Sequence, residues 1–480
     1  MKNIFKLSMA FAMLLLVSCD KSLEEVNIDP NNSPTANDSQ VLSSALGSLG
    51  YWVDVDLNSA SFLWAQYYTW GIGVSIGNVE RFVAQPDDYN NGWGRAHAQC
   101  LTDLKFLTKS ESAAYRGVGK LLTAYIYQGL VDHFGDIPYS EAISGEISEG
   151  SILTPSFDDA ATIYESLVTL VDEGIGEFEN ATPDIGSDDF VYGGDLNGWA
   201  KFGNSLKLRL LMRLSEISPK GDAVKKLISE GSFITSLSEM AAVPFSGETG
   251  SQNPMYARFE WGVGDFYFPS NATVNVLRDL GDPRLAEFYS PATVGAFSGQ
   301  IRGIDQGSVD NEPFTADPKE YGASSAYAYA VDNSVVLMSP WEVWFLRAEA
   351  AARYGTADND VDAFGEAITS NFENIGIGGA ADYIASLNYG GSLDEKLNMI
   401  GVQKWISLNG TQEDEGWIES RRFDRPGNRI FTEGIFQTPP LSVLPAGTFP
   451  ASWLYPASER SLNPNAPAQR SITDRLFWDN

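Results

Sequence analysis

The chain has 480 residues, of which 63 are Asp or Glu and 32 are Lys or Arg, and its net charge of −31 argues against nucleic acid as a partner. A surface this negative repels phosphates. A hydrophobic content of 43% over this length is sufficient for a large buried core. There are two cysteines, Cys19 and Cys100, so lipidation of the first would leave no intramolecular disulfide and the core would have to supply the stability.

The N-terminus has the features of a lipoprotein signal peptide. Lys2 and Lys6 precede an apolar run over residues 7–17 that is too short to span a bilayer, and small residues then lead to Cys19. We predict a signal peptide over residues 1–18, a lipidated Cys19, a flexible tether over 19–40 and one globular domain over 41–480. The alternative is an ordinary secretory signal in which the cysteine is incidental. No later apolar run approaches membrane-spanning length, so the lipid would be the membrane anchor.

Apolar residues at three- and four-residue spacing predict helices through much of the chain. The predicted helices cover residues 113–134, 157–178, 199–217, 272–279, 340–354, 361–372 and 393–407.

Two consecutive pairs among these helices, 113–134 with 157–178 and 340–354 with 361–372, resemble the helix–turn–helix units of tetratricopeptide arrays, although no strict repeat period emerges. Between residues 241 and 331, Gly, Pro, Asn and aromatic residues predict long loops around the single helix 272–279, and loops of that length are commonly functional. The expected fold class is mainly α: a tetratricopeptide-like scaffold of helical pairs with long loops for a ligand and little β structure.

Several segments occur in an order typical of one family. They are the N-terminal cysteine with its Asn- and Pro-rich tether, residues 133–139 (HFGDIPY), 203–209 (GNSLKLR), 282–285 (DPRL), 341–350 (WEVWFLRAEA), 404–406 (KWI), Trp417, and Arg421 with Arg422. With these segments the chain resembles the SusD/RagB-like glycan-binding lipoproteins of Bacteroidetes, and within them the branch described as starch-binding and associating with the outer membrane.

The resemblance implies a function and a location. A protein of this family would be a non-catalytic lipoprotein on the extracellular face of the outer membrane, and it would capture oligosaccharides or polysaccharides for import through a TonB-dependent, SusC-like barrel. No cofactor is expected. The acidic net charge favours a neutral glycan, such as a β-glucan, an α-glucan or a fructan, over alginate or pectin. A surface glycoside hydrolase and an adhesive or structural lipoprotein without a sugar site remain as alternatives.

Sugar rings stack on flat aromatic side chains, and their hydroxyls pair with amides, carboxylates or Arg, so the ligand residues are expected on loops. The expected ligand residues lie in two stretches, 70–93 with Trp70, Arg81, Asp88, Tyr89, Asn90 and Trp93, and 255–268 with Arg258, Trp261 and Tyr267. For Trp93 the alternative is that it begins the next helix and packs in the core. A third, weaker candidate is the segment with Tyr321, Tyr327 and Tyr329.

Other side chains favour structural roles. Trp341, Trp344, Trp405 and Trp417 have the spacing of core residues on helices. Arg421 and Arg422 could bind a sulfate or a carboxylate, but pairing with Glu413, Glu415 or Glu419 is favoured.

Catalytic and metal motifs are weak. The serine pattern over residues 73–77 (GVSIG) would need a strand before it, a helix after it and a histidine base to form a nucleophile elbow. No strand–helix alternation surrounds it, and the chain has two histidines, His97 and His133. A glycoside hydrolase needs two carboxylates, and 63 acids do not exclude it. The runs beginning at Asp54 and Asp358 start like EF-hand loops but lack the glycine and the glutamate of that loop, so no metal site is expected and a structural calcium remains the alternative.

Overall fold

Helices dominate the computed structural model, which describes residues 36–70, 79–145, 150–182, 184–258, 267–308, 317–324 and 329–479. Its longer helices are α3 (Asp38–Tyr51), α7 (Ala113–Phe134), α8 (Ala160–Glu177), α9 (Leu196–Arg213), α10 (Gly221–Glu230), α15 (Pro340–Tyr354), α16 (Asp360–Ile375), α18 (Leu393–Leu408) and α19 (Glu413–Phe423). The shorter helices are α4 (Asn58–Trp64), α5 (Asn90–Arg95), α6 (Thr102–Leu107), α11 (Pro254–Arg258), α12 (Asn271–Asp279), α13 (Leu285–Phe288), α17 (Ala380–Ser386) and α20 (Ala457–Leu462).

The strands are short and pair in twos, always antiparallel. They are β1 (Tyr68–Trp70) with β3 (Tyr267–Pro269), β2 (Ala241–Val243) with β6 (Val335–Met338), β4 (Tyr289–Ser290) with β5 (Ala323–Ser324), and β7 (Asp424–Arg425) with β8 (Asn428–Arg429). The mainly α fold with little β structure is therefore confirmed.

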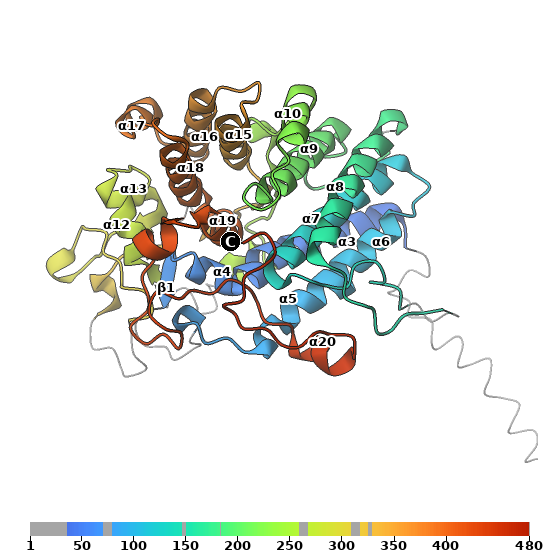
Figure 1. Ribbon diagram of the computed structural model, residues 1–480, viewed down its shortest axis with the longest axis horizontal. Coiled ribbons are helices and arrows are strands. Elements are labelled where there is room, and N and C mark those ends of the chain that lie inside the picture. The colour runs from blue at the N-terminus through green and yellow to red at the C-terminus, as the bar shows by residue number, and fades with distance from the viewer. Residues whose placement is uncertain are drawn as a thin grey trace, which may run out of the picture.

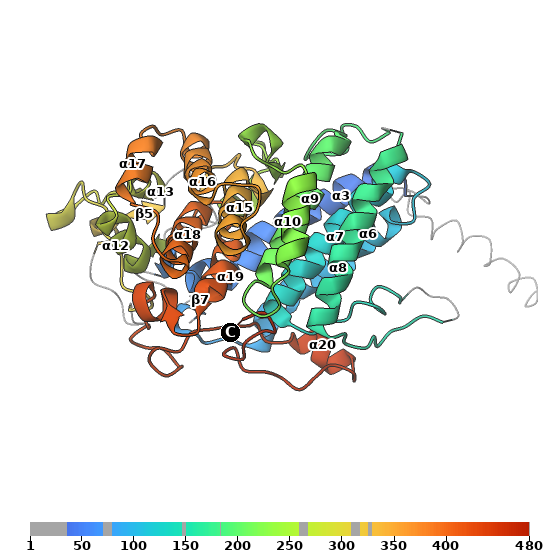
Figure 2. The same cartoon turned by 45° about the horizontal axis from the view of Figure 1, so that its top comes forward.

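The two predicted helical pairs are present. α7 packs along α8, and α15 packs along α16, while α9 and α18 extend the two groups (Figures 1 and 2). The apolar stripe of α8, with Ile163, Leu167 and Val171 buried, is the face that closes against its neighbours. At the other end of the molecule from α6, the helices α12 and α13 form a lobe in which long loops replace helical pairs (Figure 1).

Several predicted boundaries needed correction. α8 begins at Ala160, where Asp159 caps the helix, and not at residue 157. α9 runs from Leu196 to Arg213 because Asp195 caps it, so it begins before residue 199 and ends before residue 217. Residues 241–331 contain more secondary structure than predicted, since α11, α13 and four strands accompany α12 there. α3 begins at Asp38, so the end of the predicted tether is helical.

The core holds the tryptophans that were expected to be structural. Trp341, Trp405 and Trp417 are buried, and Trp344 is half-buried beneath the Arg347 guanidinium. Arg422 pairs with Glu419, as predicted. Its neighbour does not follow the prediction: the Arg421 guanidinium stacks on Trp417 and donates to backbone carbonyl oxygens instead of to a glutamate. Within the described part of the chain, no helix has the length and the apolar composition needed to cross a bilayer.

Two carboxyl groups, the buried Glu413 and the half-buried Asp54, give the fold a pH dependence near neutrality. Glu413 accepts hydrogen bonds from the Tyr329 hydroxyl at 3.3 Å and from the Gly410 N–H at 3.1 Å. Burial raises the pKa of Glu413 to about 7, and the negative charge of Asp54 raises it as well. Burial likewise raises the pKa of Asp54 to about 7. Both groups therefore bind a proton more readily in the folded protein than in the unfolded chain.

The variant Glu413→Gln is expected to make the free energy of unfolding less dependent on pH between about pH 5 and pH 8. Because the folded pKa lies above the unfolded one, the stabilisation from proton binding is fully present below the unfolded pKa and is lost as the pH rises through the folded pKa. Urea unfolding across this range measures the slope for both proteins. Glu433→Gln, at an exposed carboxyl group, is the control, and an unchanged slope for Glu413→Gln would contradict the assignment.

Candidate functional site

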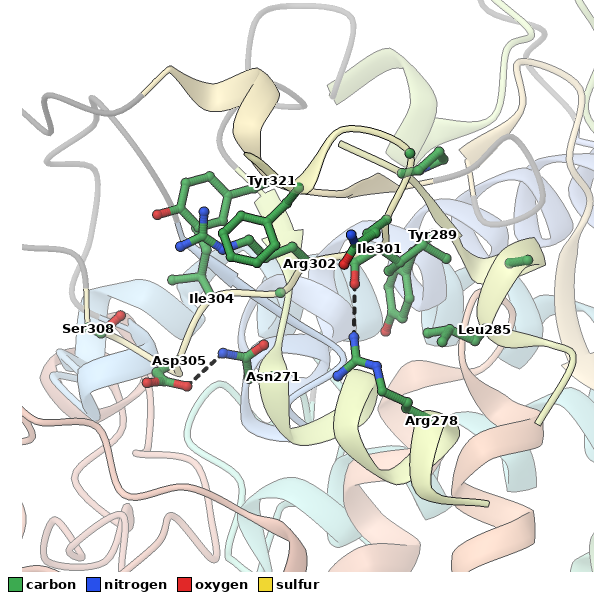
Figure 3. Close-up of a pocket in the computed structure, with 16 residues that line it drawn as sticks. Asn271, Arg278, Leu285, Tyr289, Ile301, Arg302, Ile304, Asp305, Ser308 and Tyr321 are labelled. Atoms are coloured by element: carbon green, nitrogen blue, oxygen red, sulfur yellow. Dashed lines mark hydrogen bonds between the residues drawn. The ribbon is translucent and has the colours of Figure 1, made fainter. Parts of the chain in front are cut away.

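An open recess lies in the lobe beside α12 and α13, and it is the best candidate for a binding site (Figure 3). Its volume is about 760 Å³. The walls come from α12, α13, β4, the loop over residues 291–308 and the turn before β5, so they join segments from residue 271 to residue 321. A recess of this size on the surface suits a small-molecule or oligosaccharide segment.

The loop over residues 291–308 is held by backbone hydrogen bonds. The Ile304 N–H donates to the Pro269 carbonyl at 2.9 Å, and the Asn271 N–H donates to the Ile304 carbonyl at 2.8 Å. Gly303 lies between these contacts, where a Cβ would come within 2.7 Å of the Asn271 side-chain oxygen. Only glycine permits so close an approach of the loop to the first turn of α12. The loop therefore presents its side chains from a fixed backbone.

Two aromatic rings and one arginine form the wall of the recess. The Arg302 guanidinium carbon lies 4.3 Å from the ring centroid of Phe297 and 4.1 Å from that of Tyr321, so the arginine is stacked between two rings. Phe297 is 41% exposed, which makes it a ring that a ligand can reach. Tyr321 is half-buried and meets Phe268 edge-on, with ring centroids 6.1 Å apart.

Polar groups cover the floor of the recess. The Asn271 side-chain amide donates to the Asp305 carboxylate at 2.7 Å, and the Arg278 guanidinium donates to the Ile301 carbonyl at 2.9 Å (Figure 3). Burial raises the pKa of Tyr289, whose hydroxyl donates to the Tyr67 carbonyl at 2.8 Å. The recess thus combines an exposed ring with donors and acceptors, as recognition of sugar hydroxyls requires.

The four predicted rings that the structure describes do not stand outward, which corrects the expectation for the stretches 70–93 and 255–268. Trp70 and Tyr267 face each other across the β1–β3 ladder with ring centroids 4.5 Å apart, and both are buried. Trp93 packs against Phe134 at the end of α7, as its structural alternative proposed. Tyr89 is buried against a C-terminal tryptophan. Each ring is covered by a segment distant in the sequence.

The polar predicted residues of these stretches lie away from the recess. Arg81 is buried and donates to the Gly307 carbonyl at 3.4 Å. Asp88 is exposed and accepts from the Gln85 N–H at 2.7 Å. Asn90 accepts from the N–H and the hydroxyl of Ser458 in α20. Arg258 ends α11 and is half-buried. None of these four lines the recess.

The remaining predicted features either lie outside the described residues or have structural roles. Trp261, Tyr327, the lipidation site Cys19 and the serine pattern over 73–77 lie outside the described residues. Tyr329 is buried. In the two EF-hand-like runs, Asp56 pairs with Arg95 and Asp358 with Arg347. Across the described ranges, no group of three His, Cys, Asp or Glu side chains is placed to hold a metal ion.

Phe297 and Arg302 were missed in the sequence, and Tyr321 was ranked below the other candidates. A usable signal was present, because Gly295 and Gly299 flank Phe297 and both have positive φ angles, +74° and +82°. An aromatic residue between two such glycines belongs to a loop that displays its ring. The stretch 255–268 was expected to display its rings because Gly262 and Gly264 suit such a loop, and the argument applies equally to Phe297.

Comparisons with known proteins identify relatives over most of the chain. Residues 30–432 match the SusD-like family described as "Starch-binding associating with outer membrane". A chitin-binding protein of known structure has 22% identity and a TM-score of 0.78, covering 92% of this chain and 100% of its own. A chitin-binding SusD homologue from Flavobacterium johnsoniae has 19% identity and a TM-score of 0.75, with coverages of 92% and 98%. A SusD homologue from Bacteroides uniformis has 21% identity and a TM-score of 0.75, with coverages of 92% and 99%. No curated protein matches the sequence.

Proposed function

The chain belongs to the SusD-like family, described as starch-binding and associating with the outer membrane, and on that premise we propose that it is a non-catalytic protein that captures oligosaccharides or polysaccharides at the cell surface. The observation that carries the proposal is the recess beside α12, where Phe297 is exposed and Arg302 is stacked between two rings. An accessible ring offers a flat apolar face to the C–H groups of a sugar, and the polar floor offers partners to its hydroxyls.

The same recess supports binding more than hydrolysis. Glycoside hydrolysis uses two carboxyl groups that flank the scissile bond. Among the described side chains that line the recess, Asp305 carries the one carboxylate, and it already accepts a hydrogen bond from Asn271. We therefore propose capture without turnover and without a cofactor.

The ligand is proposed to be a glycan with a neutral backbone. The net charge of −31 acts against a dense polyanion during approach, and the recess offers both donors and acceptors, which suits hydroxyls. β-Glucans, α-glucans and fructans are the candidate classes, and the two chitin-binding structures that share the fold add chitin oligosaccharides to the list of ligands to test.

Attachment and import complete the proposal. Lipidation at Cys19 would hold the protein on the extracellular face of the outer membrane, and a TonB-dependent, SusC-like barrel would take up the captured glycan. Mass spectrometry of the membrane-bound protein tests the first point, because acylation adds a defined mass to an N-terminal cysteine peptide. Co-purification with a barrel from the native membrane tests the second.

Purified protein is expected to be retarded on native gels that contain one or more of these glycans, and to leave the glycan chain length unchanged on long incubation. Retardation with no new reducing ends supports capture. Release of reducing ends would favour the glycoside hydrolase alternative. Absence of retardation on every glycan of the panel would favour the adhesive alternative and would contradict the function proposed here.

A further inference from the structure

We propose that Arg302 recognises a carboxylate group carried by the glycan, so that the preferred ligand is a neutral backbone with sparse acidic sugar residues; this rests on the function proposed above. The observation behind it is the state of the Arg302 side chain. Its guanidinium is stacked between Phe297 and Tyr321, and among the described residues none accepts a hydrogen bond from it or forms an ion pair with it.

The two rings determine which part of Arg302 a ligand can reach. They cover both faces of the guanidinium at 4.3 Å and 4.1 Å, so only the N–H groups in its plane remain accessible. That planar edge matches the two oxygens of a carboxylate and can bind them with two parallel hydrogen bonds. Because the rings already hold the long side chain, less rotamer freedom is lost when the ligand binds.

Among the described residues that line the recess, the charged side chains carry a net positive charge, opposite in sign to the charge of the chain. They are Arg278 and Arg302, against the carboxylate of Asp305. Asp305 is engaged by Asn271 on the floor, and no ion pair joins it to Arg302. Arg278 is fixed by the Ile301 carbonyl, and its exposed guanidinium adds a second positive charge to the same recess (Figure 3). A carboxylate that enters would meet a net positive surrounding.

The repulsion from the net charge of −31 and the attraction of a carboxylate to the recess act over different distances. At physiological salt, charges separated by more than about 8 Å are largely screened, whereas a carboxylate in contact with Arg302 would lie about 3 Å from its donors. A dense polyanion would be repelled along its whole length, because most of its charges would lie against acidic surface. A mostly neutral chain with an isolated carboxylate would keep the contact with Arg302 and avoid most of the repulsion.

The test compares each acidic glycan with its own carboxyl-reduced form, which has the same backbone and no charge. Glucuronoxylan and gum arabic are the probes, and affinity electrophoresis or calorimetry measures binding. We expect the native form of a bound glycan to bind about tenfold more tightly than the reduced form, and this ratio to fall as salt is raised. In Arg302→Gln the ratio should approach one. Arg460→Gln, at an exposed arginine on α20, should keep the ratio of the unaltered protein.

Each outcome bears on a different proposal. Equal binding of the native and reduced forms by the unaltered protein would overturn the carboxylate inference and leave glycan capture intact, and so would binding of neutral glycans alone. Failure to bind any acidic, reduced or neutral glycan would overturn the proposed function itself. Because the comparison of native and reduced forms needs no variant, it stands even if Arg302→Gln folds poorly.

Discussion

The double variant Phe297→Ala/Tyr321→Ala is expected to lose glycan binding while it keeps its fold. The two rings form the wall of the recess and hold Arg302 in place, so their removal takes away both the stacking surface and the fixed guanidinium. Loss of an aromatic anchor at a binding site costs about 2 kcal/mol or more, which corresponds to a drop in affinity of about thirtyfold or more. Affinity electrophoresis against a glycan that the unaltered protein binds measures the loss.

The fold should tolerate this change because neither ring belongs to the main core. Phe297 is 41% exposed, and Tyr321 packs against a small cluster of Phe268 and Ile304 that is separate from the main core. The matched control is Phe106→Ala, which removes a ring that is 42% exposed on α6, at the other end of the molecule (Figure 1). Binding equal to that of the unaltered protein in the double variant would show that sugars bind elsewhere.

Helices whose apolar residues face one side could be read from the sequence, and helices stabilised by polar pairs could not. The bounds of α7 and α15 were predicted correctly, because Gly135 and Gly355 follow their last turns and Pro340 opens α15. For α19 the sequence placed Trp417 on a helix but predicted no bounds, because EDEGWIESRRF shows no apolar stripe. It is nevertheless buried along its length, since its charged side chains pair with other helices.

Local sequence identified aromatic residues but could not say which of them reach the surface. Trp70 and Tyr267 are almost 200 positions apart, and their burial depends on a strand pairing that no local pattern encodes. Trp93 is covered by Phe134 from another helix. Phe297, by contrast, is 41% exposed. Exposure is a property of the tertiary fold. A search for surface rings by composition alone therefore selects core residues as readily as exposed ones.

The variant Glu419→Gln is expected to destabilise the fold by about 3–5 kcal/mol. Glu419 lies on α19, is 1% exposed, and accepts from Arg213 of α9, Lys404 of α18 and Arg422 of its own helix. These cations hold the pKa of Glu419 well below its usual range, despite burial. Glutamine keeps the size of the side chain but removes the charge, which leaves buried cations with too few anionic partners.

Urea unfolding at neutral pH measures this loss, and an exposed pair supplies the control. Asp172→Asn removes the partner of Lys207 at a site where the aspartate side chain is 55% exposed, and a surface pair of that kind contributes less than about 1 kcal/mol. The difference should also depend on pH, because a carboxyl group with a depressed folded pKa stabilises the fold above its unfolded pKa and loses this effect as the pH falls. Glu419→Gln and the unaltered protein should therefore converge in stability toward acid pH. A loss at neutral pH no larger than that of Asp172→Asn would mean that the remaining carboxylates, Glu349 and Glu415 among them, neutralise the three cations without Glu419.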